Sequence, residues 1–150
     1  MKAILLAGGF GTRLVKISGE RPKVLVEVAG KTLLERQIDF LTKHGIGDIR
    51  LSLHHKADQI VAFCKERWPG KFEFLVEPTP LGTGGGIRFA SRDLKDPFLV
   101  VNADILSDID LQAFALQKAN SIACAYLEDA RDFGLVHVRD GKAHGFVEKP

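Results

Sequence analysis

The sequence predicts an α/β fold built on a mostly parallel sheet. Short apolar runs alternate with amphipathic stretches along the chain. Several runs are apolar at successive positions, which is typical of strands buried on both faces of a parallel sheet. The first run, residues 2–6, leads directly into a glycine-rich loop, and such folds bind ligands at the carboxyl ends of their strands. We therefore expect a Rossmann-like sheet with helices covering both faces.

The elements follow from this alternation, taken in chain order. Leu34, Ile38 and Leu41 share one helical face, as do Ile60, Phe63 and Cys64. The expected helices span residues 33–44, 58–67, 84–92 and 111–118. The expected strands span residues 2–6, 49–53, 72–76, 98–101, 122–126 and 135–138. Asp140-Gly141 is a hairpin turn signal between residues 135–138 and 143–147, so a small antiparallel excursion is expected near the C-terminus.

Composition predicts a single domain over residues 1–150, with 45% apolar and 27% charged residues. A net charge of +2 gives no broad field that would favour nucleic acid or a membrane surface. No apolar run approaches the roughly 20 residues of a membrane span. Met1-Lys2 leads straight into the first strand, so no signal peptide is expected. Cys64 and Cys124 are far apart, which favours two buried, reduced thiols in a cytoplasmic protein.

The loop after the first strand is the most informative stretch. Glycine has no Cβ to hold a ligand away, so bare backbone amides can wrap an anion closely. Arg13 and Lys23 add positive charge to the same region, which makes a polyphosphate the natural ligand. The residues expected to contact it through this loop are Leu6, Ala7, Gly8, Gly9, Gly11 and Thr12.

Two common phosphate motifs are excluded. The dinucleotide pattern G-x-G-x-x-G needs a third glycine where Leu14 stands, and the Walker pattern needs a glycine where Leu25 stands. Residues 30–32, Gly-Lys-Thr, instead predict a tight turn before a helix. Thr32 and Glu35 have the spacing of a capping box, which agrees with that interpretation.

Gly8-Gly9-Phe10-Gly11-Thr12-Arg13, followed by Pro22-Lys23, resembles the signature of sugar-phosphate nucleotidylyltransferases, also called sugar-nucleotide pyrophosphorylases. The resemblance implies a fold of the nucleotide-diphospho-sugar transferase type and a Mg²⁺-dependent transfer of a nucleotidyl group from an NTP to a sugar 1-phosphate. It implies catalytic roles for Arg13, beside the pyrophosphate, and Lys23, beside the α-phosphate.

Residues 77–86 form a second motif, which follows a strand and opens a helix. Pro80, Gly82 and Thr83 match the family's base-recognition loop. Glu77 offers only acceptors, which suits the adjacent N1–H and exocyclic amine of guanine, so GTP is favoured. Residues 77–83 also resemble the E-x-x-P-L-G-T pattern of guanylyltransferases, which implies the mannose or heptose 1-phosphate guanylyltransferase type. The alternatives are a flexible loop, and for Glu77 a solvated strand end.

The third motif, Val100-Val101-Asn102-Ala103-Asp104, ends an apolar strand in polar groups. Asp is a hard oxygen ligand, and the resemblance makes Asp104 the metal-binding carboxylate, with Ala103 where the family usually has Gly. Asn102 is expected on the sugar-phosphate side. The alternative is a simple turn or helix cap. Asp108 and Asp110 are expected to cap the helix that begins at Leu111.

The fourth motif, Phe146-Val147-Glu148-Lys149-Pro150, resembles the family's E-K-P segment. It implies that Glu148 binds sugar hydroxyls and Lys149 the sugar phosphate, with Gly134 close to the sugar. Taken alone, Glu148-Lys149 is an exposed charged pair. The adjacent His54 and His55 point to opposite sides of a strand and predict no metal site.

Other functions stay open from sequence. A non-catalytic nucleotide-binding or NDP-sugar-binding regulatory relative is one, although Arg13 and Lys23 are intact. Transfer to a non-sugar phosphate such as phosphocholine is another, and an α/β domain with a different ligand is a third. Members of the resembled family are longer, so a chain truncated at its C-terminal end, without the second metal-binding Asp, is expected. A homo-oligomer is compatible with the sequence, and the sugar is not determined.

Overall fold

The structure is a computed structural model that describes residues 1–9, 19, 21–117, 119–131 and 133–148. The chain forms two compact units, Met1–Ala115 and Leu116–Pro150, which are described separately. The expectation of one domain over the whole chain stays a prediction.

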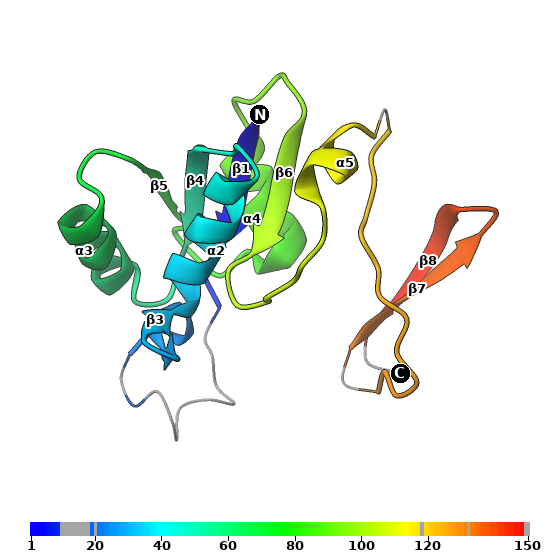
Figure 1. Ribbon diagram of the computed structural model, residues 1–150, viewed down its shortest axis with the longest axis horizontal. Helices are drawn as coiled ribbons and strands as arrows, with labels where there is room; N and C mark the ends of the chain where they lie inside the picture. The colour runs from blue at the N-terminus through cyan, green and yellow to red at the C-terminus, as the bar shows by residue number, and fades with distance from the viewer. Residues whose placement is uncertain (10–18, 20, 118, 132, 149–150) are drawn as a thin grey trace. The chain divides into compact units, whose positions relative to one another are not determined.

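A four-stranded parallel sheet forms the centre of the first unit (Figure 1). Its strand order is β5-β4-β1-β6, with β1 at Lys2–Leu6, β4 at Asp48–Leu53, β5 at Glu73–Val76 and β6 at Phe98–Asn102. Leu6 pairs with Ser52 on one side and with Asn102 on the other, so the carboxyl ends of β1, β4 and β6 are level. The mostly parallel sheet expected from the sequence is confirmed.

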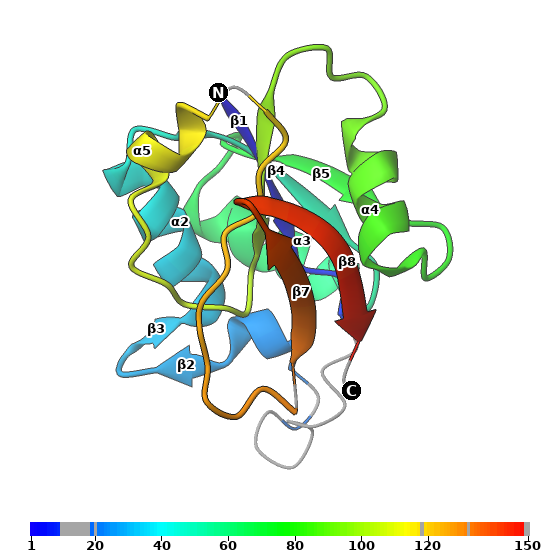
Figure 2. The same ribbon diagram turned by 90° about the vertical axis from the view of Figure 1, so that its right-hand side faces the viewer.

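Helices cover both faces of this sheet. Helix α2 (Leu33–Lys43) lies on one face and α4 (Gly82–Ser91) on the other, as two perpendicular views show (Figures 1 and 2). Helices α3 (Ala57–Arg67) and α5 (Leu111–Ala115) contribute side chains to the same apolar cluster as α2. The layered arrangement follows from strands that are buried on both faces.

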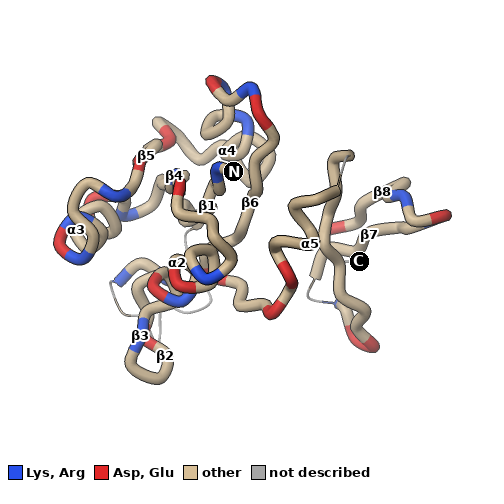
Figure 3. The backbone as a smooth tube through the Cα atoms, turned by 45° about the horizontal axis from the view of Figure 1, so that its top comes forward, with Lys and Arg blue, Asp and Glu red and all other residues tan. Residues whose placement is uncertain are grey.

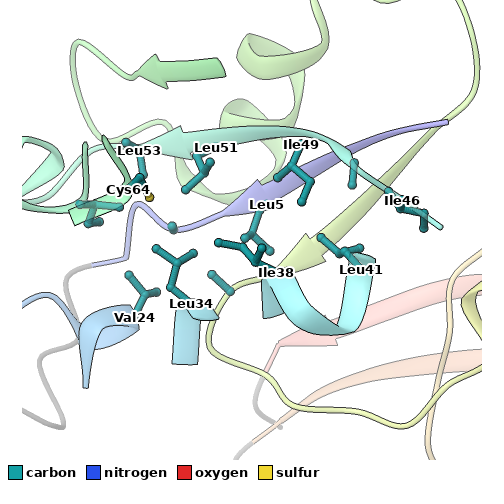
Figure 4. Close-up of a cluster of buried hydrophobic side chains, with 14 of the residues drawn as sticks. Leu5, Val24, Leu34, Ile38, Leu41, Ile46, Ile49, Leu51, Leu53 and Cys64 are labelled. Carbon is teal, nitrogen blue, oxygen red and sulfur yellow. The ribbon is translucent and has the colours of Figure 1, made fainter. Parts of the chain in front are cut away.

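The apolar core lies between the sheet and α2 and α3 (Figure 4). Leu5 and Leu51 from the sheet meet Leu34 and Ile38 from α2, and each is at most 2% exposed. Burying one such side chain stabilises a fold by about 1.5–3 kcal/mol. This cluster therefore provides the main stabilisation of the first unit.

A short hairpin precedes α2. Strands β2 (Glu27–Val28) and β3 (Lys31–Thr32) pair antiparallel around Ala29 and Gly30, whose φ angles are 48° and 77°. The Thr32 side chain accepts from the Glu35 backbone N–H, and the Glu35 carboxylate accepts from the Thr32 N–H. The predicted tight turn and capping box are both confirmed.

The second unit contains an antiparallel hairpin of β7 (Gly134–Arg139) and β8 (Lys142–Glu148). Its turn residues Asp140 and Gly141 have φ angles of 51° and 70°, the left-handed pair that a two-residue hairpin turn requires. The register shifts between His137 and Val138. The predicted antiparallel excursion is confirmed.

Three expectations from sequence are corrected. Residues 122–126 are not a strand: Ile122 is 60% and Tyr126 94% exposed, and an apolar run becomes a strand only beside a neighbour that pairs with its backbone.

The helix expected over 111–118 ends at Ala115. At its start, the Asp110 carboxylate accepts from the N–H groups of residues 112 and 113. Cys124 is exposed rather than buried, whereas burial raises the pKa of the Cys64 thiol to about 12.

Candidate functional site

The carboxyl edge of the parallel sheet gathers residues from three of the four motifs. Just past the strand ends, Ala7 N–H donates to the Ser52 carbonyl at 2.9 Å, and Glu77 N–H donates to the Leu53 carbonyl at 2.7 Å. Ala103 N–H donates to the Leu6 carbonyl at 3.0 Å. These bonds continue the sheet pattern and bring the starts of the three motif loops to one edge.

The glycine-rich loop packs against the end of β4. A Cβ on Gly8 would lie 3.1 Å from the backbone nitrogen of His54, tighter than most real contacts, so the close approach favours glycine there. Gly9 has open space around the position of a Cβ. Leu6 is half-buried and Ala7 is 5% exposed. Gly11, Thr12 and Arg13 lie outside the described residues.

Lys23 and Asp104 meet at this edge although 81 residues separate them in the sequence. The Lys23 Nζ lies 2.7 Å from the Asp104 Oδ2, and the two side chains are 33% and 35% exposed. Lys23 begins a 3₁₀ turn, η2 (Lys23–Leu25), between the buried residues Pro22 and Val24. The predicted catalytic lysine and the predicted metal ligand therefore form one accessible ion pair.

Asp104 is a single carboxylate that can bind a metal ion together with substrate phosphates. Among the described residues, no group of three or more His, Cys, Asp or Glu side chains could hold a metal ion. Mg²⁺ is usually held by one or two carboxylates together with waters and substrate phosphates, rather than by a protein cage. One accessible carboxylate fits a Mg²⁺ ion that arrives with a polyphosphate. Ala103, the departure from the family pattern, is fully buried in the apolar cluster, where its small side chain fits.

Glu77 is not a solvated strand end, because its side chain is buried against three neighbours. The Ser52 hydroxyl donates to its Oε1 and the Leu81 N–H to its Oε2, both at 3.1 Å. On α4, a Cβ added to Gly86 would lie 2.6 Å from Oε1. The alternative weighed from the sequence is wrong, and the carboxylate links β4, the loop after β5 and helix α4.

The loop after Glu77 is exposed at Pro80, Gly82 and Thr83. Gly82 has a φ of 69°, a left-handed conformation that favours glycine at the start of α4. Gly85 approaches Leu81 so closely that a Cβ there would lie 2.8 Å from the Leu81 Cβ. Gly82, Gly85 and Gly86 therefore serve backbone conformation and packing, while the exposed side of the loop can face a ligand.

Sequence reasoning missed two buried polar residues that support the edge. Ser52 is 1% exposed and holds Glu77, and Gln37 is 2% exposed and donates to the carbonyl of Ile105, the residue after Asp104. Gln37 carries a signal in the sequence, because it lies next to Ile38 in an otherwise apolar helix face. Ser52 alternates with Leu51 and Leu53, a pattern that assigns it to a solvent-facing side of the strand, so its burial has no local signal.

The hairpin of the second unit brings together two residues predicted to bind the sugar. Gly134 and Glu148 are directly opposite each other in the register of β7 and β8. A Cβ on Gly134 would overlap the Phe146 ring and lie 3.3 Å from the Glu148 Oε2. Glycine at 134 therefore lets the aromatic ring cover the strand beside the carboxylate. Lys149 lies outside the described residues.

Charge does not separate by sign along the chain. Figure 3 shows Lys and Arg interleaved with Asp and Glu over the described part of the chain, for example Lys65, Glu66 and Arg67 at the end of α3. No helix in that part has both the length and the hydropathy to cross a membrane. The local Lys23–Asp104 pair, not a broad basic surface, is the electrostatic feature of the edge.

The sequence model of the family described as nucleotidyl transferase matches residues 2–150. The chain belongs to this family. A mannose-1-phosphate guanyltransferase from Gibberella zeae is 36% identical over 164 residues, which include 100% of this chain and 45% of that protein. A D-glycero-alpha-D-manno-heptose 1-phosphate guanylyltransferase from Campylobacter jejuni is 34% identical, covering 92% of this chain and 63% of that protein.

A solved structure shares the fold. The crystal structure of HddC from Yersinia pseudotuberculosis complexed with GMP-PN matches with a TM-score of 0.84 and 34% identity, over 99% of this chain and 69% of that one. This similarity agrees with the nucleotide-diphospho-sugar transferase type of fold inferred from the glycine-rich motif. The chain spans about half to two thirds of the length of these relatives.

Proposed function

We propose that this nucleotidyltransferase moves a guanylyl group from GTP to a sugar 1-phosphate, which yields a GDP-sugar and pyrophosphate. The observation that carries the proposal is the 2.7 Å pair of Lys23 and Asp104 at the carboxyl edge, beside the glycine-rich loop. A cation and a hard oxygen ligand at one accessible point suit a reaction at a polyphosphate. The names of the guanylyltransferase relatives support the same substrate class.

The reaction needs charge neutralisation and positioning rather than a general base. The second phosphate pKa lies near ~6, so the sugar-phosphate oxygen is already ionised at neutral pH. That oxygen forms a bond to the α-phosphorus of GTP, the bond from this phosphorus to the bridging oxygen breaks, and pyrophosphate leaves with the electron pair. We assign Lys23 to the α-phosphate and the attacking oxygen, and Arg13 to the pyrophosphate.

The proposed cofactor is Mg²⁺, held by Asp104 together with the substrate phosphates. When bound, Mg²⁺ neutralises phosphate charge and orients the phosphate oxygens. Asp104 would hold the ion, and the Lys23 ammonium, now paired with Asp104, would then be available to bind the α-phosphate. The glycine-rich loop after β1 is proposed to bind the nucleotide through Leu6, Ala7, Gly8, Gly9, Gly11 and Thr12.

Guanine selection is assigned to Glu77 and the exposed loop at Pro80, Gly82 and Thr83. Two hydrogen bonds occupy one lone pair on each Glu77 oxygen, and a carboxylate has about four acceptor sites in all. The remaining sites can accept the N1–H and the 2-amino group of guanine. On the sugar side, Asn102, Gly134, Glu148 and Lys149 are proposed to bind the sugar phosphate.

We place the reaction in the cytoplasm, where free thiols such as Cys64 and Cys124 stay reduced.

Pyrophosphate release tests the proposal directly. Each of ATP, GTP, CTP, UTP and dTTP is paired with a panel of sugar 1-phosphates and with phosphocholine, with and without Mg²⁺. The expected result is Mg²⁺-dependent release that needs GTP and one sugar 1-phosphate. Release with phosphocholine alone would contradict the sugar assignment. GTP binding without release from any pair would instead indicate a nucleotide-binding relative without catalysis.

A further inference from the structure

We propose that Ser52 is a specificity-determining residue that selects guanine by fixing the orientation of the Glu77 carboxylate. The inference rests on the proposed function, because it concerns the base of the same nucleotide. It goes beyond that function by naming a residue that touches no substrate. Ser52 acts through Glu77 and is therefore a positioning residue.

Two hydrogen bonds fix the orientation of the Glu77 carboxylate. The Ser52 hydroxyl lies at the end of β4 with 1% exposure and donates to Oε1, while the Leu81 N–H donates to Oε2. The Ser52 carbonyl accepts from the Ala7 N–H at 2.9 Å, so the same residue is also tied to the glycine-rich loop. Ser52 thus couples the position of the base-recognition carboxylate to the predicted phosphate loop.

Helix α4 packs against Oε1, the carboxylate oxygen that also accepts from Ser52. Gly86 is buried, and a Cβ at this position would lie 2.6 Å from Oε1 and 3.7 Å from the Ser52 Oγ. Without a side chain at Gly86, Glu77 packs directly on the helix. Ser52, the Leu81 amide and Gly86 therefore hold the carboxylate from three directions.

A fixed, acceptor-only carboxylate distinguishes guanine from hypoxanthine. Both bases present N1–H, but only guanine has the adjacent 2-amino donor. A site built to accept a particular N–H discriminates strongly against an analogue that lacks it, because the buried acceptor is then left unpaired. The ratio of the dissociation constants of ITP and GTP therefore measures how well Glu77 is oriented toward the amine.

The experiment is competition by GTP and by ITP against a fluorescent GTP analogue, with the whole chain as wild type and as Ser52→Ala. Wild type is expected to bind GTP roughly 10- to 100-fold more tightly than ITP, the range of one hydrogen bond to a charged group. Ser52→Ala is expected to lower that ratio by roughly 3- to 10-fold, mainly through weaker GTP binding.

Two further variants separate orientation from stability. Gly86→Ala leaves the Ser52 hydroxyl intact and places a methyl group against Oε1, which displaces the carboxylate, so it should also lower the ratio. Alanine is a better helix former than glycine, and this gain offsets part of the cost of displacing the Glu77 carboxylate, so the variant is a second test of its orientation. Cys64→Ala truncates a fully buried side chain of the apolar cluster away from Glu77, and it should leave the ratio at the wild-type value.

The outcomes distinguish this inference from the function on which it rests. A wild-type chain that binds no GTP, or binds ITP equally well, overturns the guanine assignment and the Ser52 role together. A wild-type preference for GTP that survives intact in Ser52→Ala and Gly86→Ala overturns only the Ser52 role. Equal weakening of GTP and ITP binding in these variants would show that Ser52 is only structural and would overturn it as well.

Discussion

The two faces of strand β4 are both buried, yet they are held in opposite ways. Ile49, Leu51 and Leu53 point into the apolar cluster with α2 and α3, and none is more than 1% exposed. Arg50 and Ser52 point to the α4 side and are also nearly inaccessible, at 2% and 1%. One strand thus carries an apolar surface and a polar surface at alternating positions.

The polar face is held by a chain of directional contacts. Arg50 makes a two-pronged contact with Glu73, contacts both carboxylate oxygens of Asp93, and donates to the Ala90 carbonyl at 2.5 Å. Two residues further along the same face of β4, the Ser52 hydroxyl donates to the Glu77 carboxylate. Hydrogen-bonded groups specify orientation, whereas apolar contacts mainly supply stability. The comparison indicates that the apolar face stabilises the unit and that the polar face positions α4 and the loop that we propose to recognise the base.

Truncation on the apolar face is expected to have the largest effect on stability. Leu51→Ala removes a fully buried side chain from the centre of the cluster and should cost about 2–5 kcal/mol in the free energy of unfolding. Urea denaturation measures it. The preference for GTP over ITP should stay at its wild-type value in the folded fraction. A cost below about 1 kcal/mol would mean that this face is not the main source of stability.

Disruption of the polar face should cost less. Arg50→Leu removes, among other contacts, the buried hydrogen bond to the Ala90 carbonyl, and a hydrogen bond made by a charged group contributes about 1.5–3 kcal/mol. Urea denaturation of both variants gives the loss in the free energy of unfolding for Arg50→Leu relative to that for Leu51→Ala. A cost as large as that of Leu51→Ala would break the proposed division between the two faces.

Acid should distinguish the two faces further. Hydrogen bonding to Arg50 lowers the pKa of Asp93 from 3.8 to about 2, and the same guanidinium lowers the pKa of Glu73. A carboxyl whose folded pKa is depressed stabilises the fold above its ordinary pKa and loses that contribution as pH falls through the folded value. The difference between wild type and Arg50→Leu should therefore shrink between about pH 4 and pH 2, whereas the cost of Leu51→Ala should not change over that range.

A helix cap provides the smallest effect in the series. Thr32→Ala removes the acceptor for the Glu35 N–H at the start of α2 and should cost about 1 kcal/mol. Thermal unfolding measures the change. Because the cap belongs to neither face of β4, it calibrates how much a single local hydrogen bond contributes. A larger cost than that of Arg50→Leu would contradict the ranking.

Features encoded within a few residues could be predicted from the sequence. The turn at Asp140-Gly141 and the capping box of Thr32 and Glu35 depend on neighbouring residues, and both are present. The prediction of a strand over residues 122–126 was wrong, because a strand depends on a pairing partner that no local pattern specifies.

Contacts between residues far apart in the sequence limited how much of the site could be predicted. Glu77 could be read as exposed because Ser52 lies 25 residues earlier and Gly86 belongs to the next helix, so its burial has no local signature. Lys23 and Asp104 were each predicted near the phosphates, but the fold alone brings them to 2.7 Å. Gln37 was detectable in principle, as a polar residue on the apolar face of its helix, whereas the alternation of β4 assigns Ser52 to the polar face and gives no local sign of its burial.

Pyrophosphate release by Lys23→Ala with saturating GTP, Mg²⁺ and the accepted sugar 1-phosphate tests the central claim, that the edge with Lys23 and Asp104 performs the transfer. The matched control is Lys2→Ala, which removes a lysine at the opposite, amino end of β1, where it pairs with Asp48 at 2.9 Å. Turnover should fall by about 10²–10³-fold in Lys23→Ala and stay at the wild-type rate in the control. Near-normal turnover in folded Lys23→Ala would contradict the claim.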